Sequence, residues 1–343
     1  MLADEGERVF WEDFEDSDSQ WEIDNGIWEI GEPTSGPSSS YEGSSVAATN
    51  LSGNYSDNDT DSRLISPSID LPGAGADEEI LLRFWQWYAY EYRDRGHVQI
   101  SVWDGSAWGD WTTLLESAQE YANSGWSRVG VDLTAYEGQR VRIAFYHLEH
   151  SSSASSGWYI DGVEIWHGVP SFAPVEGFES GWDDWYTDHG VWQIGEPSSG
   201  PSGAYEGSSV AGTILSGNYP SYDTDSRLIS PSFYLPGAGA DEEILLRFWQ
   251  WYDYAYRDRG DVQISIWDGS SWGDWTTLLN SAQEDGSSDW SRMAVDLTAY
   301  AGQRVRIAFF HVESSSVSSG WYIDQVRIIT CYRRRENAIN VAI

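Results

Sequence analysis

The chain has 343 residues, and its 19 basic residues, all of them arginine, face 55 acidic ones, for a formal net charge of −36. This charge argues against nucleic acid or an anionic membrane as a partner, because both need a basic surface. No run of about 18 apolar residues is present, so no membrane insertion is expected, and the single cysteine, Cys331, excludes an internal disulfide.

The chain is a tandem duplication. The segment LPGAGADEEILLRFWQWY occurs at 71–88 and again at 235–252, an offset of 164 residues that also aligns YEGSSVA at 41 with 205 and GQRVRIAF at 138 with 302. The offset falls to 163 near the end, where GWYID occupies 157–161 and 320–324. A repeat of this length is the size of a domain rather than of a solenoid unit. We therefore expect two domains, at 7–168 and 169–330, followed by an unassigned basic tail at 331–343.

Short alternating runs bounded by Gly, Pro, Ser, Asn and Asp fill each copy, and no long apolar stripe of helical period appears. The clearest strands predicted in the first copy are 80–90, 97–103, 127–133, 140–148 and 158–166. In HVQISVWD, for example, Val98, Ile100 and Val102 alternate with polar or aromatic residues. This pattern predicts an all-β fold with one aliphatic core face per strand.

Turn and loop signals separate these strands. WDGS at 103–106 and 267–270 contains the Asp-Gly pair of a hairpin turn. Pro67 and Pro231 lack an N–H group, which places their segments at an edge or a bulge. The region before each proline, including GEPTSGPSSSYEGSS, is predicted to form long loops, where binding residues of β-sandwiches commonly lie.

An ordered set of motifs marks both copies. Each begins with Phe-Glu and then Trp, at Phe14, Glu15 and Trp21 and again at 178, 179 and 185; it continues through GEP, SGP and RLISPS and ends on GWYID followed by Val. This set resembles the MAM-like jelly-roll superfamily, in particular choice-of-anchor J and cleaved-adhesin domains and similar domains of immune-inhibitor-type secreted metallopeptidases. The resemblance implies two tandem jelly-roll β-sandwich domains in an extracellular or cell-surface protein.

The resemblance also implies a structural calcium ion in each copy. In similar jelly rolls the opening Phe-Glu and the closing Ile-Asp meet in space, which pairs Glu15 with Asp161 and Glu179 with Asp324. The sequence departs from the common ending Asp-Asp-Val, because Gly162 and Gln325 replace the second acid. Ordinary hydrogen-bonded acids remain the alternative. A second acidic group, Asp59 and Asp61 with their counterparts at 223 and 225, is a further candidate for a cation.

A ligand face is predicted on the repeated strand. Flat aromatic rings beside planar hydrogen-bonding groups suit a sugar ring and its hydroxyl groups. If neighbouring strands share the face, Gln99, Arg142 and Tyr146 also join it. The alternative is internal packing, with arginine lying over tryptophan. The candidate ligand residues are Arg83, Trp85, Trp87 and Trp103 in the first copy and Arg247, Trp249, Trp251 and Trp267 in the second.

No catalytic motif is evident. Of the six histidines only His147 and His311 repeat, and the sequence has neither a His-Glu-x-x-His motif nor a Gly-x-Ser-x-Gly elbow between strand and helix. We therefore expect a non-enzymatic binding or adhesion module for a glycan or an extracellular protein. Accessory domains of a secreted peptidase or glycosidase are the alternative. The ligand and the oligomeric state are not specified by the sequence.

Overall fold

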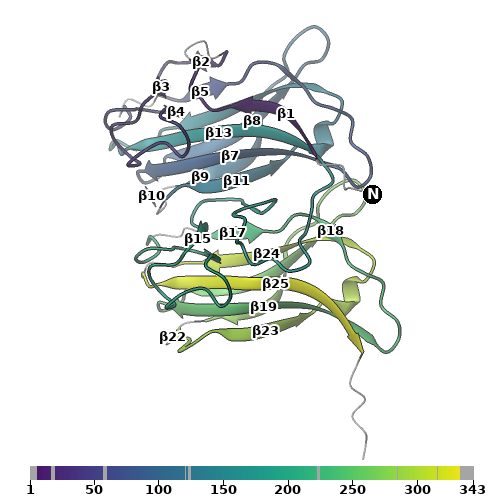
Figure 1. The fold of residues 1–343 in the computed structure, drawn as a ribbon. Helices are drawn as coiled ribbons and strands as arrows, with labels where there is room; N and C mark the ends of the chain where they lie inside the picture. Colours follow the sequence, from purple (N-terminus) through teal and green to yellow (C-terminus); the bar gives the residue numbers. More distant parts are fainter. Residues whose placement is uncertain are drawn as a thin grey trace, which may run out of the picture.

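The computed structural model describes residues 6–16, 20–56, 60–119, 121–122, 125–221, 225–283, 285–314 and 316–332. Within these ranges almost all regular structure is β-strand, and the helical segments are the short 3-10 turns η1 (Thr134–Tyr136) and η2 (Thr298–Tyr300). The all-β sandwich class predicted from the alternating pattern is confirmed (Figure 1).

The first copy consists of two antiparallel layers. One layer contains β3 (Glu29–Gly31), β4 (Val46–Ala48), β13 (Gly157–Gly168), β7 (Glu79–Tyr90) and β11 (Ser127–Asp132), with β1 (Glu7–Glu12) on β13 and β10 (Tyr121–Ala122) on β7. The other contains β2 (Glu22–Asp24), β5 (Ser62–Ile65), β12 (Arg140–Leu148), β8 (Arg95–Val102) and β9 (Thr112–Ala118), with β6 (Ile69–Asp70) on β12.

The second copy repeats this order of elements. One layer contains β15 (Gln193–Gly195), β16 (Val210–Gly212), β25 (Gly320–Tyr332) and β19 (Glu242–Tyr254), with β22 (Asp285–Gly286) and β23 (Ser291–Asp296) both on β19. The other contains β14 (Tyr186–Thr187), β17 (Ser226–Ile229), β24 (Arg304–Val312), β20 (Arg259–Ile266) and β21 (Thr276–Ala282), with β18 (Phe233–Tyr234) on β24.

One boundary differs from the prediction. Cys331 and Tyr332 were assigned to the tail, but they continue β25 and pair with Glu243 and Glu242 at the start of β19. The strand extends because its partner β19 begins at Glu242, which leaves ladder positions for both residues. The rest of the predicted tail, 333–343, lies outside the described residues.

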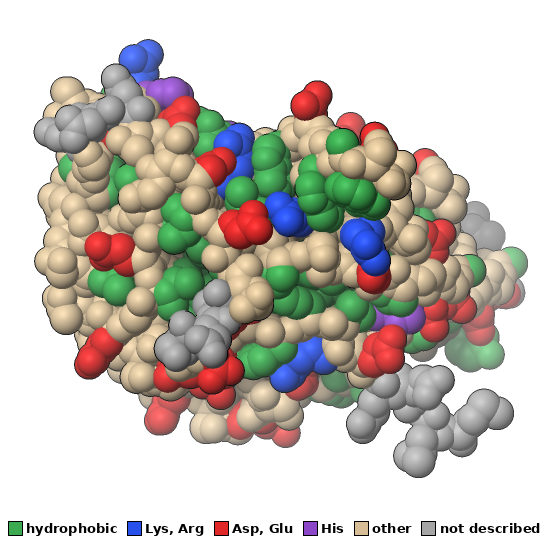
Figure 2. Space-filling view, turned by 90° about the horizontal axis from the view of Figure 1, so that it is seen from above, with side chains coloured by type: hydrophobic (Ala, Val, Ile, Leu, Met, Phe, Trp, Pro, Cys, Tyr) green, Lys and Arg blue, Asp and Glu red, His purple; other side chains and the backbone are tan. Residues whose placement is uncertain are grey.

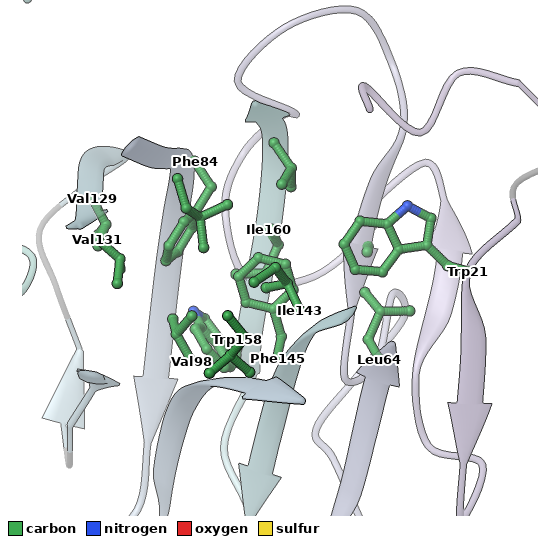
Figure 3. Close-up of a cluster of buried hydrophobic side chains, with 14 of the residues drawn as sticks. Trp21, Leu64, Phe84, Val98, Val129, Val131, Ile143, Phe145, Trp158 and Ile160 are labelled. Carbon is green, nitrogen blue, oxygen red and sulfur yellow. The ribbon is translucent and has the colours of Figure 1, made fainter. Parts of the chain in front are cut away.

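Aromatic and aliphatic side chains fill the space between the two layers of the first copy (Figure 3). Phe84 of β7 and Phe145 of β12 are fully buried and meet edge to face with ring centroids 4.9 Å apart. Trp21 stacks on Phe145 at 5.9 Å. Alternate residues of β7 face this core, so the residues between them, including Arg83 and Trp85, face outward. The second copy has an equivalent core.

The two copies share one sheet. β14 of the second copy pairs in parallel with β11 of the first through Thr187 and Val129, and it pairs antiparallel with β17 of its own copy. The layer of copy one that contains β7 and β11 and the layer of copy two that contains β14 therefore merge into a single sheet of 13 strands. Figure 1 shows the two sandwiches stacked, with β11 and β17 at the junction.

A buried ion cluster joins the copies beside this junction. The guanidinium group of Arg306 lies 2.9 Å from Glu79 and 2.9 Å from Asp132, and Trp272 donates its indole N–H to Asp132 at 3.0 Å. Arg304 adds hydrogen bonds to the carbonyls of residues 76 and 77. Because the Arg306 and Glu79 side chains are only 7% and 2% exposed, water cannot replace either partner.

Each core also contains a buried histidine. The phenolic groups of Tyr90 and Tyr254 lie 2.8 and 2.9 Å from Nδ1 of His147 and His311. Both rings are fully buried, and burial lowers the pKa of His147 to about 4 and that of His311 to about 3. Both rings are therefore neutral at pH 7.

We expect Arg306→Met to destabilise the protein by about 3–5 kcal/mol, because it removes the guanidinium group that Glu79 and Asp132 share inside the junction. Arg142→Met is the matched control: Arg142 occupies the same position in copy one, where its partner Glu22 is 64% exposed, and the loss should be about 0–1 kcal/mol. Urea unfolding at pH 7 measures both. Equal losses in the two variants would contradict a structural role for the cluster.

The two buried histidines should make stability fall as the pH is lowered from about 6.5 to about 4. In this window the unfolded chain binds a proton on each ring and the folded chain does not, so each ring lowers the free energy of unfolding by about 1.4 kcal/mol per pH unit. The variant with His147→Asn and His311→Asn should lack this component. The measurement is the difference between wild-type and variant unfolding free energies across the window, because acids common to both cancel; a constant difference would rule the effect out.

Candidate functional site

The side chain of Glu15 in copy one binds the backbone of a loop. It follows Phe14, a buried residue with a positive φ of 58°, which turns the chain so that the next side chain points at residues 41–45. Glu15 Oε1 accepts the N–H groups of Ser44 and Ser45 at 2.7 and 2.6 Å, and Oε2 accepts the Ser44 hydroxyl at 2.9 Å. These bonds fix one end of the YEGSS loop.

Asp161 holds the other end of the same loop. It lies where the register of β13 against β7 shifts, at a β-bulge, and its side chain is fully buried. Asp161 Oδ2 accepts the N–H groups of Tyr41 and Glu42 at 2.9 and 3.0 Å. Oδ1 accepts the N–H group of Gly162 at 2.7 Å. Glu15 and Asp161 are therefore brought to one loop.

The second copy repeats this arrangement. Glu179 Oε1 accepts the N–H groups of Ser208 and Ser209, each at 2.9 Å, and Asp324 Oδ2 accepts that of Glu206 at 3.0 Å. We call each set of two acids with its loop, 41–45 or 205–209, the carboxylate clasp. Gly207 is required in it: its φ is 75°, and a Cβ there would lie 2.2 Å from Glu179 Oε1.

The two acids of a clasp have different electrostatic environments. Hydrogen bonds from the backbone of Ser44 and Ser45 lower the pKa of Glu15. Burial raises the pKa of Asp161 to about 6, and the nearby charge of Glu15 acts in the same direction. Burial also raises the pKa of Asp324 to about 6. The interaction between the two carboxylates of copy one is the kind that a cation between them would relieve.

The clasp fits calcium only in part. It supplies two carboxylates, whereas calcium needs six to eight oxygen ligands, and hydrogen-bond donors already occupy three lone-pair positions on each acid of copy one. Among the described residues no three His, Cys, Asp or Glu side chains are grouped for a metal. The second acidic candidate includes Asp59 and Asp223, which lie outside the described part of the chain. Calcium stays a prediction for both copies.

Three aromatic side chains lie together beside each clasp. Tyr41 is the first residue of its loop and stacks on Trp85 of β7, with ring centroids 3.5 Å apart and an angle of 13°. Trp126 meets the edge of Tyr41 at 6.3 Å. In copy two, Tyr205 stacks on Trp249 at 3.7 Å and Trp290 takes the edge position. We call each triplet the aromatic platform. Its tyrosine is 43% exposed in copy one and 41% exposed in copy two.

Other predicted ligand residues lie elsewhere, and the single shared face is wrong. β7 and β8 belong to different layers, so Trp103, together with Gln99, Arg142 and Tyr146, lies across the sandwich from Trp85. The reason is that β7 pairs with β11 and β13 rather than with its sequence neighbour β8. In the same way Trp267 does not join Trp249; Trp103 and Trp267 each pack on a tryptophan across a hairpin.

The repeated strand itself is used differently in the two copies. Arg83 is buried at the junction, 2.8 Å from Asp184 of copy two and 4.8 Å over the ring of Trp166. Its counterpart Arg247 is partly exposed and has no recorded ion pair within the described residues. Trp87 and Trp251 pack edge-on against Tyr159 and Tyr322. Of the predicted ligand residues, only Trp85 and Trp249 belong to the platforms.

Trp267 lines a cleft between the copies. The cleft has a volume of about 520 Å³, and Tyr234, Arg304 and Glu78 also line it. Trp103, its counterpart, follows β8 in the layer of copy one that does not join the shared sheet. Tyr41, Tyr205, Trp126 and Trp290 are the platform residues that sequence reasoning missed. The signal for the tyrosines was the YEGSS motif at the start of both loops.

Comparisons with known proteins give partial likenesses. No family model matches the chain. Bacillopeptidase F of Bacillus subtilis (strain 168) is 34% identical over 159 residues, which is 45% of this chain and 10% of that protein. The chain therefore spans about a tenth of the length of this relative.

Solved structures show low overall similarity. The K1 cleaved adhesin domain of Lys-gingipain from Porphyromonas gingivalis W83 is 23% identical with a TM-score of 0.30 and covers 46% of this chain and 96% of its own. The tandem CBM22-1 and CBM22-2 domains of Paenibacillus barcinonensis Xyn10C are 12% identical with a TM-score of 0.31, over 96% of this chain and 100% of theirs. Across the described residues, no helix is long and apolar enough to span a membrane.

If calcium binds at the clasps, it stabilises the folded state alone, by about 2.7 kcal/mol at a hundredfold excess over Kd. Melting temperatures in millimolar calcium and in excess chelator should then differ by several degrees, and Asp161→Ala with Asp324→Ala should remove the difference. Magnesium should substitute poorly because it needs a tighter octahedral shell. Equal melting temperatures at fixed ionic strength would leave the clasps as hydrogen-bonded loop anchors only.

Proposed function

We propose that the chain is a non-catalytic extracellular binding module whose aromatic platforms bind a glycan. The observation that carries this proposal is the pair of loop-held tyrosines, Tyr41 and Tyr205, each stacked flat on a tryptophan and each more than a third exposed. A sugar ring presents C–H groups that pack on the open face of such a ring.

The platforms are rigid enough to serve this purpose. Carboxylate bonds hold the loop at both of its ends, so the tyrosine needs little ordering when a ligand arrives. Trp126 and Trp290 are fixed in turn by hydrogen bonds from their indole N–H groups to the carbonyls of Ser39 and Gly203. Serine hydroxyls and the exposed Glu42 and Glu206 side chains beside the rings offer hydrogen bonds to sugar hydroxyls.

A catalytic role receives no support from the repeated histidines. His147 and His311 are fully buried behind their tyrosine partners and cannot reach a substrate from the core. The second candidate function is an accessory segment of a secreted peptidase, and the likeness to Bacillopeptidase F favours it. A catalytic domain encoded in the same reading frame would support that role, and glycan binding by the platforms is compatible with it.

The variant with Tyr41→Ala and Tyr205→Ala should bind polysaccharide at least about tenfold more weakly, a loss of about 1.4 kcal/mol. Affinity electrophoresis on a panel of polysaccharides measures the retardation. The matched control replaces Tyr92 and Tyr256 by alanine, because these exposed tyrosines also occupy equivalent positions in the two copies but lie outside the platforms. Equal retardation of both variants and the wild type, or none for the wild type, would reject the platforms as the site.

A further inference from the structure

We propose that the chain associates head to tail with a second copy of itself, by docking β2 and its neighbours on the open face of β19, β23 and β25. The template is the junction already present inside the chain. There, β14, β20 and β24 of copy two pack on β7 and β11 of copy one. The same two surfaces recur once more, at the opposite ends of the chain, and in the described structure neither β2 nor β23 has a strand on its outer side.

Both edge strands needed for this contact are open in the described structure. β2 is the counterpart of β14 and ends its sheet, and β23 is the counterpart of β11 and has β19 as its recorded strand partner. Unpaired edges of this kind readily accept another strand. Ile23 in β2 is a 41% exposed apolar residue, and it stands where Thr187 bridges to Val129 at the internal junction. On β23 the position that corresponds to Val129 is Met293, so an Ile–Met pair takes the place of the Thr–Val pair of the internal junction.

The ionic part of the template is retained. Arg142 lies over Trp108 at 4.6 Å, as Arg306 lies over Trp272 at 4.0 Å. On the face of copy one turned away from copy two, arginine and hydrophobic side chains lie side by side (Figure 2). The acids that Arg306 meets, Glu79 and Asp132, recur as Glu243 and Asp296. A second chain docked by the same operation places its Arg142 against this pair.

The residues that changed between the two surfaces changed together. In copy one, Glu164 lies opposite Arg83 across the strands, and its counterpart is Arg327, opposite Arg247. Arg292 lies one position away on the same face, opposite Trp249. The open face thus has three arginines with no recorded ion pair among the described residues, in a chain of charge −36. Like charges on neighbouring strands destabilise a sheet unless an acid is supplied.

Copy one carries that acid on the docking side, at Glu22, which is 64% exposed and lies 3.3 Å from Arg142 of its own chain. Glu22 in β2 is the counterpart of Tyr186, which at the internal junction lies over Gly130, beside Arg83. In the docked pair Glu22 of one chain therefore lies over Ala294 and beside Arg247 of the other. In copy one the acid beside Arg83 is Glu164 of the same sheet, whereas at the open face of copy two the acid beside Arg247 is Glu22 of the second chain. This complementarity selects a second copy of the chain as the occupant.

The contact is heterologous, so it leaves one free surface at each end and extends into open chains rather than closing as a dimer. We expect the mean mass in sedimentation velocity to rise with protein concentration at about 0.15 M salt, where screening limits the repulsion between acidic chains. Arg142→Glu and Asp296→Arg should each remain monomeric. An equimolar mixture of the two should associate again, because each surface then finds a complementary one.

Arg247→Glu is the second variant on the acceptor side and tests the charge without touching the Asp296 bonds to Thr298. The Tyr41→Ala and Tyr205→Ala variant separates this proposal from glycan binding, since it should lose polysaccharide retention and keep self-association. A wild type that is monomeric at every concentration, variants that associate as it does, or association only when polysaccharide is added would each overturn the proposal.

Discussion

The ion cluster of Arg306, Glu79 and Asp132 is the interaction on which the arrangement of this molecule depends. A charge buried at a junction is costly unless its partners are in place, so the two sandwiches are stable together only in the orientation that brings these groups together. The β11 to β14 bridge then follows from that orientation. The two tandem domains that the sequence predicts are therefore joined into one body with a continuous sheet.

The carboxylate clasp plays the same part inside each copy. It connects the first and last segments of a sandwich through the loop at 41–45 or 205–209, and the loop in turn places a tyrosine on the outward tryptophan of the central strand. Structural acids and aromatic residues, which the sequence suggests as two independent sites, are thus one unit. Burial raises the pKa of Asp161 to about 6, although its three backbone hydrogen bonds act in the opposite direction.

Much of the fold follows from sequence because its signals are local. The alternation of apolar and polar residues predicts β7, β8 and β12 as strands. The shared offset of 164 residues predicts that the two copies have equivalent elements. Strand partners are not local, and the error in the ligand face arose there: Trp103 follows Trp85 closely in sequence, yet β7 and β8 lie in different layers. The stacking of Tyr41 was also out of reach, because it depends on where Glu15 and Asp161 hold a loop that has no periodicity of its own.

The differences between the copies carry as much information as their likeness. Residues inside a duplicated core stay alike because the packing constraint is the same in both, as with His147 and His311. A residue at the junction has a partner in one copy and an open surface in the other. Glu164 and its counterpart Arg327 occupy one place in the fold but differ in charge. Glu164 pairs with Arg83 and Arg128 beside the junction, whereas Arg327 lies opposite Arg247 on the face of copy two away from the junction. A face kept apolar and basic in a strongly acidic protein is costly in solution, and association with an acidic surface removes that cost.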